Sequence, residues 1–245
     1  AGAARGGAPT SGGGGAAEEG VLPAKGKEKG LTTHLALDCE MVGVGPDGVR
    51  SALARACLVN DEGNVVLDTY VRPTEAVTDF RTAVSGIRPH HLRGAPLLAE
   101  VQERVARLLR GRVLVGHALR NDLKVLLLSH PKKDTRDTAQ YTPFTFVRRP
   151  KGADGARTGP PKRRPRKLAD LAKQHLGTTI QSGAHTPVED ARAALYLYQM
   201  HRTEWERSLK QPQSRVAKRK ARAREKTARA DAGAREQSFD AADDD

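Results

Sequence analysis

The sequence has little cysteine, few aromatic residues and no long apolar run. Its two cysteines among 245 residues, Cys39 and Cys57, both lie in apolar, strand-like segments. These positions argue against a disulfide framework and predict buried, reduced thiols, which suit an intracellular protein. No charged-then-apolar start resembles a secretory signal. Since no apolar run approaches the roughly 18 residues of a membrane span, we expect no membrane contact.

Apolar residues are scarce enough to predict disorder over part of the chain. Hydrophobic residues make up 38% and aromatic residues 4% of the composition, which is low for a fully globular chain. Residues 1–30 are rich in Gly and Ala without a hydrophobic period, and predict a disordered tail. Residues 207–245 are basic and then acidic, and we expect them to be disordered or partly helical. One domain is predicted between the tails, over residues 31–206.

Positive charge is concentrated outside the core of this domain. The net charge is +13, and the segment 148–167 carries nine cationic residues against one acid. It is too rich in Pro, Gly and charge to pack, so we predict an inserted basic loop. Basic appendages on a neutral core indicate binding to a polyanion such as nucleic acid; solubility or nuclear import is the alternative. The candidate substrate contacts in the loop are Arg148, Arg149, Lys162, Arg163 and Arg164.

Hydrophobic patterns predict an α/β fold with a mixed five-stranded sheet and helices on both faces. A hairpin of two strands should turn at residues 61–64, and residues 78–89 should be irregular. The later strands alternate with helices, which is typical of a mixed sheet covered on both sides. The predicted strands are 34–42, 52–59, 65–71, 112–116 and 135–138, and the predicted helices are 96–110, 117–128, 168–176 and 187–205.

Two acids lie on one face of the first predicted strand. Because side chains alternate along a strand, Asp38 and Glu40 project together while Cys39 points the other way. The strand is apolar enough to be an interior strand, where two unpaired carboxylates would be costly. Such a pair indicates a divalent cation, although an exposed edge strand would carry it harmlessly.

Two further acids and one histidine complete a candidate catalytic site. Asp122 lies in the helix that follows the fourth strand, and Asp190 lies in the first turn of the last helix, five residues after His185. That helix has a clear beginning, because residues 186–189 form a capping box with Pro at the first helical position. Taken singly, each residue has an ordinary explanation. Asp122 could be a surface acid, Asp190 an acid that interacts favourably with the helix dipole, and His185 a loop histidine.

The segments around these residues resemble the three motifs of the DEDDh 3′–5′ exonucleases, which belong to the ribonuclease H-like superfamily. Two more segments resemble a nuclear RNA exonuclease of eukaryotes more specifically. The resemblance covers about residues 31–206, and the basic stretch before Leu168 is longer and more charged than the family leads us to expect. The three motifs are 37–43 (LDCEMVG), 115–122 (VGHALRND) and 185–191 (HTPVEDA), and the two further segments are 77–87 (VTDFRTAVSGI) and 130–138 (HPKKDTRDT).

This resemblance implies a ribonuclease H-like fold and a 3′–5′ exonuclease that releases nucleoside 5′-monophosphates. Single-stranded RNA is the favoured substrate, and DNA stays open. We expect the protein to be a monomer and to lie in the nucleus, more specifically in the nucleolus. We also expect it to take part in nuclear or ribosomal RNA processing, with ribosome-biogenesis partners. The basic runs 162–167 and 218–226 resemble import signals.

The residues themselves account for such chemistry. Four converging carboxylates cannot all stay ionised without cations, and hard oxygen ligands suit two Mg²⁺ or Mn²⁺ ions about 4 Å apart. Asp38 would bridge the ions, with Glu40, Asp122 and Asp190 completing the ligands. His185 can take a proton from water at neutral pH, since its ordinary pKa is about 6.5.

Met41 and Arg81 are candidate substrate contacts, although a core methionine and a surface ion pair are the alternatives. We expect His117 to order the second motif. Two rival functions are a non-catalytic nucleic-acid-binding protein and a metal-dependent phosphatase or nucleotide hydrolase acting on small substrates. The complete set of site residues argues against the first rival, and the basic loop and tail argue against the second.

Overall fold

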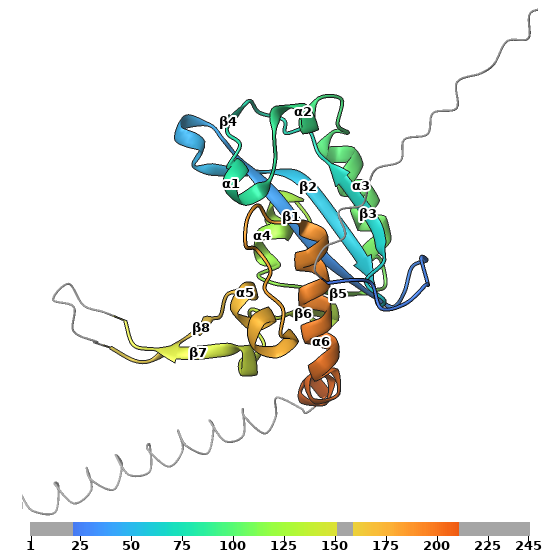
Figure 1. Cartoon of the computed structure of the whole chain (residues 1–245), viewed down its shortest axis with the longest axis vertical. Coiled ribbons are helices and arrows are strands. Elements are labelled where there is room, and N and C mark those ends of the chain that lie inside the picture. Colours follow the sequence, from blue (N-terminus) through green and yellow to red (C-terminus); the bar gives the residue numbers. More distant parts are fainter. Residues whose placement is uncertain (1–21, 151–158, 211–245) are drawn as a thin grey trace, which may run out of the picture. The chain divides into compact units, whose positions relative to one another are not determined.

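The computed structural model describes residues 22–150 and 159–210, and its centre is a mixed six-stranded sheet. The β1–β2 and β2–β3 pairs are antiparallel, whereas β1–β5 and β5–β6 are parallel. The predicted mixed α/β architecture is confirmed, including the hairpin of the second and third strands (Figure 1). Five strands lie in the order β3 (Val65–Tyr70), β2 (Arg50–Asn60), β1 (His34–Val44), β5 (Val113–Gly116) and β6 (Thr135–Asp137).

The prediction that residues 78–89 are irregular is wrong in part. A sixth strand, β4 (Val77–Asp79), pairs antiparallel with the end of β1. Two single turns of helix follow, α1 (Thr82–Ser85) and α2 (Pro89–Leu92). Elements this short show no hydrophobic period, so only the tertiary pairing reveals them.

The helix predicted over residues 117–128 is shorter in the structure. Ala118 and Leu127 have positive φ angles of 57° and 53°, which end α4 on both sides. The last helix continues beyond residue 205. The longer helical elements are α3 (Leu98–Leu109), α4 (Arg120–Val125), α5 (Leu168–Leu171) with the following turn η4 (Ala172–Leu176), and α6 (Pro187–Lys210).

The two faces of β1 meet different layers. Leu35 packs with Val105 of α3 and with Leu126 at the end of α4 in one apolar core. Asp38 and Glu40 project to the opposite face because side chains alternate along the strand. Figure 1 shows α6 lying across that opposite face. The predicted covering of both sheet faces by helices is therefore confirmed.

The segment 148–167, predicted to be an unpacked loop, instead begins and ends as a β-ribbon. β7 (Thr145–Arg148) and β8 (Lys162–Pro165) pair antiparallel in a separate two-stranded sheet. The two strands pair through main-chain hydrogen bonds, which need no apolar pattern. The composition of the segment therefore did not predict them. The prediction holds for the side chains, since residues 146–148 and 162–165 are exposed. The predictions for residues 1–21, 151–158 and 211–245, including the basic run 218–226, lie outside the described residues.

Residues 22–30, predicted to belong to a disordered tail, contact the domain. The side-chain amide of Asn60 donates to the Glu28 carbonyl at 2.6 Å, and the Tyr196 hydroxyl donates to the Pro23 carbonyl at 2.6 Å. The segment carries almost no apolar residues, so its attachment rests on polar side chains that are distant in sequence. Composition alone therefore misplaces this boundary.

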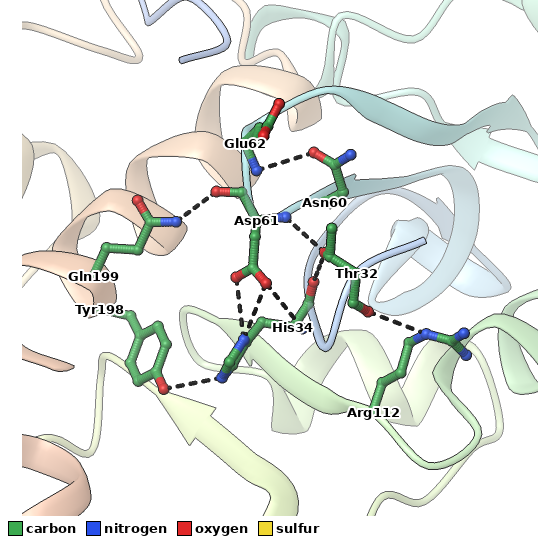
Figure 2. Close-up of polar contacts among 8 residues, drawn as sticks. All are labelled: Thr32, His34, Asn60, Asp61, Glu62, Arg112, Tyr198 and Gln199. Atoms are coloured by element: carbon green, nitrogen blue, oxygen red, sulfur yellow. Dashed lines mark hydrogen bonds and ion pairs between the residues drawn. The ribbon is translucent and has the colours of Figure 1, made fainter. Parts of the chain in front are cut away.

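A polar network at the start of β1 joins the sheet to α6 (Figure 2). His34 Nδ1 lies 3.2 Å from Asp61 Oδ2, and His34 Nε2 lies 3.3 Å from the Tyr198 hydroxyl oxygen. The side chain of Gln199 donates to the Asp61 carbonyl at 2.5 Å. Because Tyr198 and Gln199 belong to α6, the network fixes the helix that also carries Asp190.

The chain divides into two compact units, residues 1–200 and 201–245, and the described part of the second unit is the end of α6. Both cysteines are free and buried, as predicted. Across residues 22–150 and 159–210, the structure contains no helix with both the length and the apolar character needed to cross a membrane.

We predict that Asn60→Ala lowers the free energy of unfolding by about 1–3 kcal/mol, the cost of leaving buried polar groups without partners. Asn60 is fully buried; its Nδ2 donates to the Glu28 and Gly30 carbonyls, and its Oδ1 accepts from the Glu62 and Asn64 N–H groups. Urea unfolding measures the change. Asn64→Ala changes a half-buried neighbour and is the control, so it should lower the free energy of unfolding by less. An equal decrease in both variants would contradict the anchoring role of Asn60.

Candidate active site

Asp38 and Glu40 lie on the face of β1 that looks toward α6. Glu40 is 6% exposed, whereas Asp38 is only partly buried. Strand β1 is paired with β2 along both acids, whereas its pairing with β5 covers only residues 34–36. The burial of Glu40 argues against a fully solvated edge strand.

Asp122 reaches the same region from the first turn of α4, after a tightly packed segment. Gly116 ends β5 where a Cβ would lie 2.4 Å from Leu119 Cδ2, so a larger residue does not fit. Ala118 then adopts its positive φ, and its N–H donates to Asp137 Oδ1 at 2.8 Å. The chain therefore turns sharply and enters α4 with Asp122 facing the sheet.

His117 and Cys39 complete the surroundings of this second motif. His117 Nδ1 lies 2.8 Å from Thr138 Oγ1, and the His117 ring also hydrogen-bonds the Arg166 carbonyl. Burial lowers the pKa of His117. Asp122 is 4% exposed and accepts hydrogen bonds from the main chain and the thiol of Cys39. These contacts fit the expected ordering role of His117.

The third motif brings His185 and Asp190 from the beginning of α6. Thr186 Oγ1 accepts from the Glu189 N–H at 3.3 Å, the contact of an N-terminal cap, and Pro187 opens the helix as predicted. The His185 N–H donates to the Val84 carbonyl of α1 at 2.7 Å. The loop before α6 is therefore held on α1, and the cap sets the direction of Asp190.

Three of these side chains meet at one place, and Asp38 and Asp122 lie close enough to act on them through their charge. Glu40, His185 and Asp190 each offer a ligand atom, and the three atoms lie within 4.8 Å of one another. His185 Nδ1 is 3.8 Å from Asp190 Oδ2, which also accepts from Gln181 Nε2 at 2.7 Å. Asp190 Oδ1 is buried and has no hydrogen-bond partner within the described part of the chain. A buried carboxylate oxygen without a partner leaves a position that a cation can fill.

Burial raises the pKa of every carboxyl group in the cluster. At Asp38 the negative charges of Asp122, Asp190 and Glu40 add to the effect of burial, and at Glu40 the nearby Arg55 opposes it. Mutual repulsion at this density requires either protons or cations. The resulting pKa is about 8 for Glu40, about 7 for Asp122, about 6 for Asp190 and well above the ordinary value for Asp38.

Comparison with known families identifies this arrangement. Residues 35–198 match the family described as Exonuclease, and this range includes all three predicted motifs. The chain belongs to the exonuclease family. The resemblance stated from the sequence is therefore confirmed.

Curated relatives of this exonuclease carry the name RNA exonuclease 4. The protein of Homo sapiens is 51% identical over 177 residues, which cover 72% of this chain and 39% of the relative. The protein of Xenopus tropicalis is 47% identical over 203 residues, which cover 82% of this chain and 46% of the relative. The chain thus spans less than half the length of these two relatives.

Solved structures of Pan2 share the fold. A Saccharomyces cerevisiae Pan2 pseudoubiquitin hydrolase–RNA exonuclease module in complex with A7 RNA matches with a TM-score of 0.58 and 30% identity, over 80% of this chain and 33% of that chain. The Neurospora crassa Pan2 catalytic unit matches with a TM-score of 0.57 and 27% identity, over 77% of this chain and 30% of that chain. These matches confirm the ribonuclease H-like fold.

The residues of the exonuclease site fit a divalent cation. Their donors are carboxylate oxygens plus one imidazole, which suits Mg²⁺ or Mn²⁺ better than zinc. The partnerless Asp190 Oδ1 points to the same conclusion. The raised pKa values mean that cation binding displaces protons from the site.

The predicted substrate contacts lie in three places. The Arg81 guanidinium donates to Ser51 Oγ at 2.8 Å and to the Gly48 carbonyl at 2.7 Å, so it holds the turn before β2. Met41 is half-buried against the apolar core and lines a pocket of about 700 Å³ beside Asn121. Contact of either residue with substrate stays a prediction. Arg148, Lys162, Arg163 and Arg164 lie on the ribbon, and Arg149 follows β7 directly.

Sequence reasoning missed three residues that position the site. Asp137 accepts from the N–H groups of Ala118 and Ala139 and from Gln140, and so shapes the second motif. Gln181 orients Asp190, and Arg55 lies opposite Glu40 on β2. The place of Asp137 at the end of a short strand was a usable signal, whereas Gln181 lies in an irregular segment that gives none.

We predict that the metal-free protein becomes less stable as the pH rises from about 4.5 to about 8. An unfolded Glu loses its proton near 4.5, whereas folded Glu40 keeps it to about 8, so the folded state binds more protons in between and the free energy of unfolding falls. Melting temperatures in EDTA measure this, and Mg²⁺ should flatten the dependence.

Asp38→Asn should raise the melting temperature in EDTA at pH 8, because it removes one repelling charge. Asp47→Asn, which changes an exposed acid, is the matched control and should leave the melting temperature unchanged. If the melting temperature in EDTA instead rose over the same pH range, the proposed repulsion between the carboxylates would be contradicted.

Proposed function

We propose that this domain is a divalent-metal-dependent 3′–5′ exoribonuclease that releases nucleoside 5′-monophosphates from single-stranded RNA. The observation that carries the proposal is the meeting of Glu40, His185 and Asp190, one of whose oxygens has no partner among the described residues. Asp38 and Asp122 lie close enough to add their negative charge. The names of the curated relatives and the RNA bound to a Pan2 neighbour support this reaction and substrate class.

The four carboxylates would hold two Mg²⁺ or Mn²⁺ ions. When bound, such ions neutralise the carboxylates, lower the pKa of a water and stabilise the charge that develops on phosphate oxygens. The chain's own contribution is rigidity: Asp122 is fixed by Cys39 and Asp190 by Gln181. Rigid ligands determine where the scissile phosphate can lie.

His185 is the group to which we assign the proton of the attacking water. Its Nδ1 faces Asp190 Oδ2 at 3.8 Å, which leaves Nε2 to accept the proton. Burial lowers the pKa of His185 from the ordinary 6.5, so the imidazole is neutral at pH 7. Its side chain is 28% exposed, which leaves room for water and substrate to reach it.

A polymeric substrate is favoured over a small phosphate ester. A pocket of about 1360 Å³ includes His185 in its lining but none of the four carboxylates. Arg88 and Arg192 also line it, together with Arg55, whose charge is paired with Asp68. Sites for single small molecules measure about 300–1,000 Å³, so this space suits more than one nucleotide. Arg88 and Arg192 suit a phosphate chain, which favours a polymer over the substrate of the rival phosphatase.

The cellular assignments belong to this proposal as well. A nuclear and nucleolar location, ribosomal RNA processing, ribosome-biogenesis partners and a monomeric state are expectations from the sequence resemblance. Residues 162–167 are basic and exposed, as an import signal must be. A tagged protein that stayed in the cytoplasm would overturn the location.

We predict that end-labelled single-stranded RNA incubated with Mg²⁺ is shortened to a ladder, and that Asp122→Asn abolishes this hydrolysis while the protein stays folded. Loss of one ligand spoils the metal geometry without opening a cavity. EDTA should stop the reaction, and Mn²⁺ should restore it. Glu103→Gln, an exposed change on α3, is the control. Intact binding without a ladder would instead support the non-catalytic rival, and a matched DNA oligonucleotide separates RNA from DNA preference.

We predict that His185→Ala lowers kcat by roughly 10²- to 10⁴-fold, the usual contribution of a general base. Equilibrium binding of RNA in EDTA should change little, because proton transfer is needed only in the reaction. Single-turnover rates and binding titrations separate the two effects. Equal losses in rate and affinity would assign His185 to substrate binding.

A further inference from the structure

The β7–β8 ribbon lies outside the main sheet and exposes most of its side chains. Seven of its eight residues are exposed, and Thr145 is half-buried. A two-stranded ribbon without a covering layer is marginally stable in water. Its sequence, TFVR and KRRP, contains four cations and no acid. A surface of this kind suits an anionic partner.

The root of the ribbon is attached to the second motif. Phe144, directly before β7, is fully buried, and the N–H of Arg166, directly after β8, donates to the Phe144 carbonyl at 3.4 Å. The Arg166 carbonyl in turn accepts from His117, in the segment that leads to Asp122. Figure 1 shows β7 and β8 running side by side from this root, next to α5. The ribbon is therefore an extension of the catalytic site's own framework.

The register sorts the side chains into two unlike faces. Residues directly opposite each other in an antiparallel pair share a face, and faces alternate along each strand. Phe146 is opposite Arg164, and Arg148 is opposite Lys162, so these four share one face, which we call the Phe146 face. Among the described residues, its three cations have no ion-pair partner.

The other face is partly satisfied within the chain. Val147 is opposite Arg163, and Thr145 is opposite Pro165. Arg163 Nη1 donates to Thr145 Oγ1 at 2.9 Å and to the Thr142 carbonyl at 3.5 Å. The guanidinium of Arg163 therefore already donates hydrogen bonds within the chain. The Phe146 face keeps all three of its cations available.

We propose that the Phe146 face is a binding platform for single-stranded RNA, on which a base stacks against Phe146 while Arg148, Lys162 and Arg164 neutralise phosphates. An aromatic ring among cations is the arrangement by which proteins hold single strands without reading sequence. The inference rests on the proposed exoribonuclease function, because the root of the ribbon adjoins the second motif of the proposed site. The platform would hold the part of the strand that extends away from the carboxylate cluster.

The test compares equal charge changes on the two faces. Arg164→Gln, on the Phe146 face, should weaken binding of a labelled single-stranded RNA and reduce the slope of log K against log salt by about 0.7, the value for one lost phosphate contact. Arg163→Gln, its neighbour in β8, is the matched control and should leave the slope close to wild type. Fluorescence anisotropy in EDTA measures binding without turnover. If both variants lost the same affinity and salt dependence, the two faces would bind RNA equally. That result would overturn the platform, because the ribbon would then act only through its total charge.

The apolar positions supply a second matched pair. Phe146→Ala should weaken RNA binding by roughly 5- to 150-fold without changing the salt slope, because stacking involves no counterion release. Val147→Ala, on the opposite face, should leave affinity unchanged. Phe146 is 38% exposed and Val147 58%, so melting temperatures of the two variants are measured alongside and should change little. No effect of Phe146→Ala would overturn the stacking contact, and retained RNA binding by all four variants would mean that the ribbon serves an acidic protein or another partner.

A dinucleotide separates this inference from the proposed function. It is too short to extend from the cluster onto the ribbon, so Arg164→Gln and Phe146→Ala should affect its hydrolysis far less than they affect binding of the longer RNA. If wild-type protein hydrolyses neither substrate, the exoribonuclease proposal fails, while the anisotropy comparison still decides whether the Phe146 face binds RNA. Loss of dinucleotide hydrolysis in Arg164→Gln would show that the ribbon supports the catalytic site and would overturn the platform.

Discussion

The structure depends on holding four carboxylates together on one side of a sheet, against their mutual repulsion. Burial and neighbouring charge raise the pKa of Asp38 and Glu40 far above ordinary values, so the cluster by itself favours separation. What opposes it is packing on the other face of the same strand, where Leu35 and Leu37 lie in the apolar core with α3 and α4. Strand β1 therefore carries the repelling carboxylates on one face and, on the other, the apolar contacts that offset their repulsion.

Each acid outside β1 depends on a neighbour that restricts its segment. Asp122 follows a turn that is held by Asp137 and packed at Gly116. Asp190 is oriented by Gln181, and the loop before it is fixed to the Val84 carbonyl of α1. The polar network around His34 anchors α6 further along its length (Figure 2). The site is thus assembled from hydrogen bonds made by residues that do not take part in the chemistry.

The positive charge next to the cluster is paired with another acid, and the cations of the ribbon lie outside it. Arg55 lies opposite Glu40 but makes two hydrogen bonds to Asp68, at 2.8 and 2.7 Å, so its charge is shared. The cations of the ribbon stand beyond His117 and Arg166, outside the core. This separation would let the carboxylates keep their affinity for cations while the proposed RNA platform holds a polyanion elsewhere. A basic group inside the cluster would compete with the metal for the same oxygens.

The sequence by itself determined the sheet, the family and the candidate acids, because these rest on periodicity and local motifs. Alternation along 34–42 was enough to place Asp38 and Glu40 together, and a capping pattern was enough to begin α6 at Pro187. Only the tertiary structure decided which distant groups meet. Asn60 binding to residues 22–30, Asp137 supporting Ala118, the turn-holding role of Arg81 and the pairing of β7 with β8 all join segments without a shared local pattern. Periodicity reports which face of an element is buried, whereas hydrogen bonds between irregular segments depend on coordinates that no local pattern encodes.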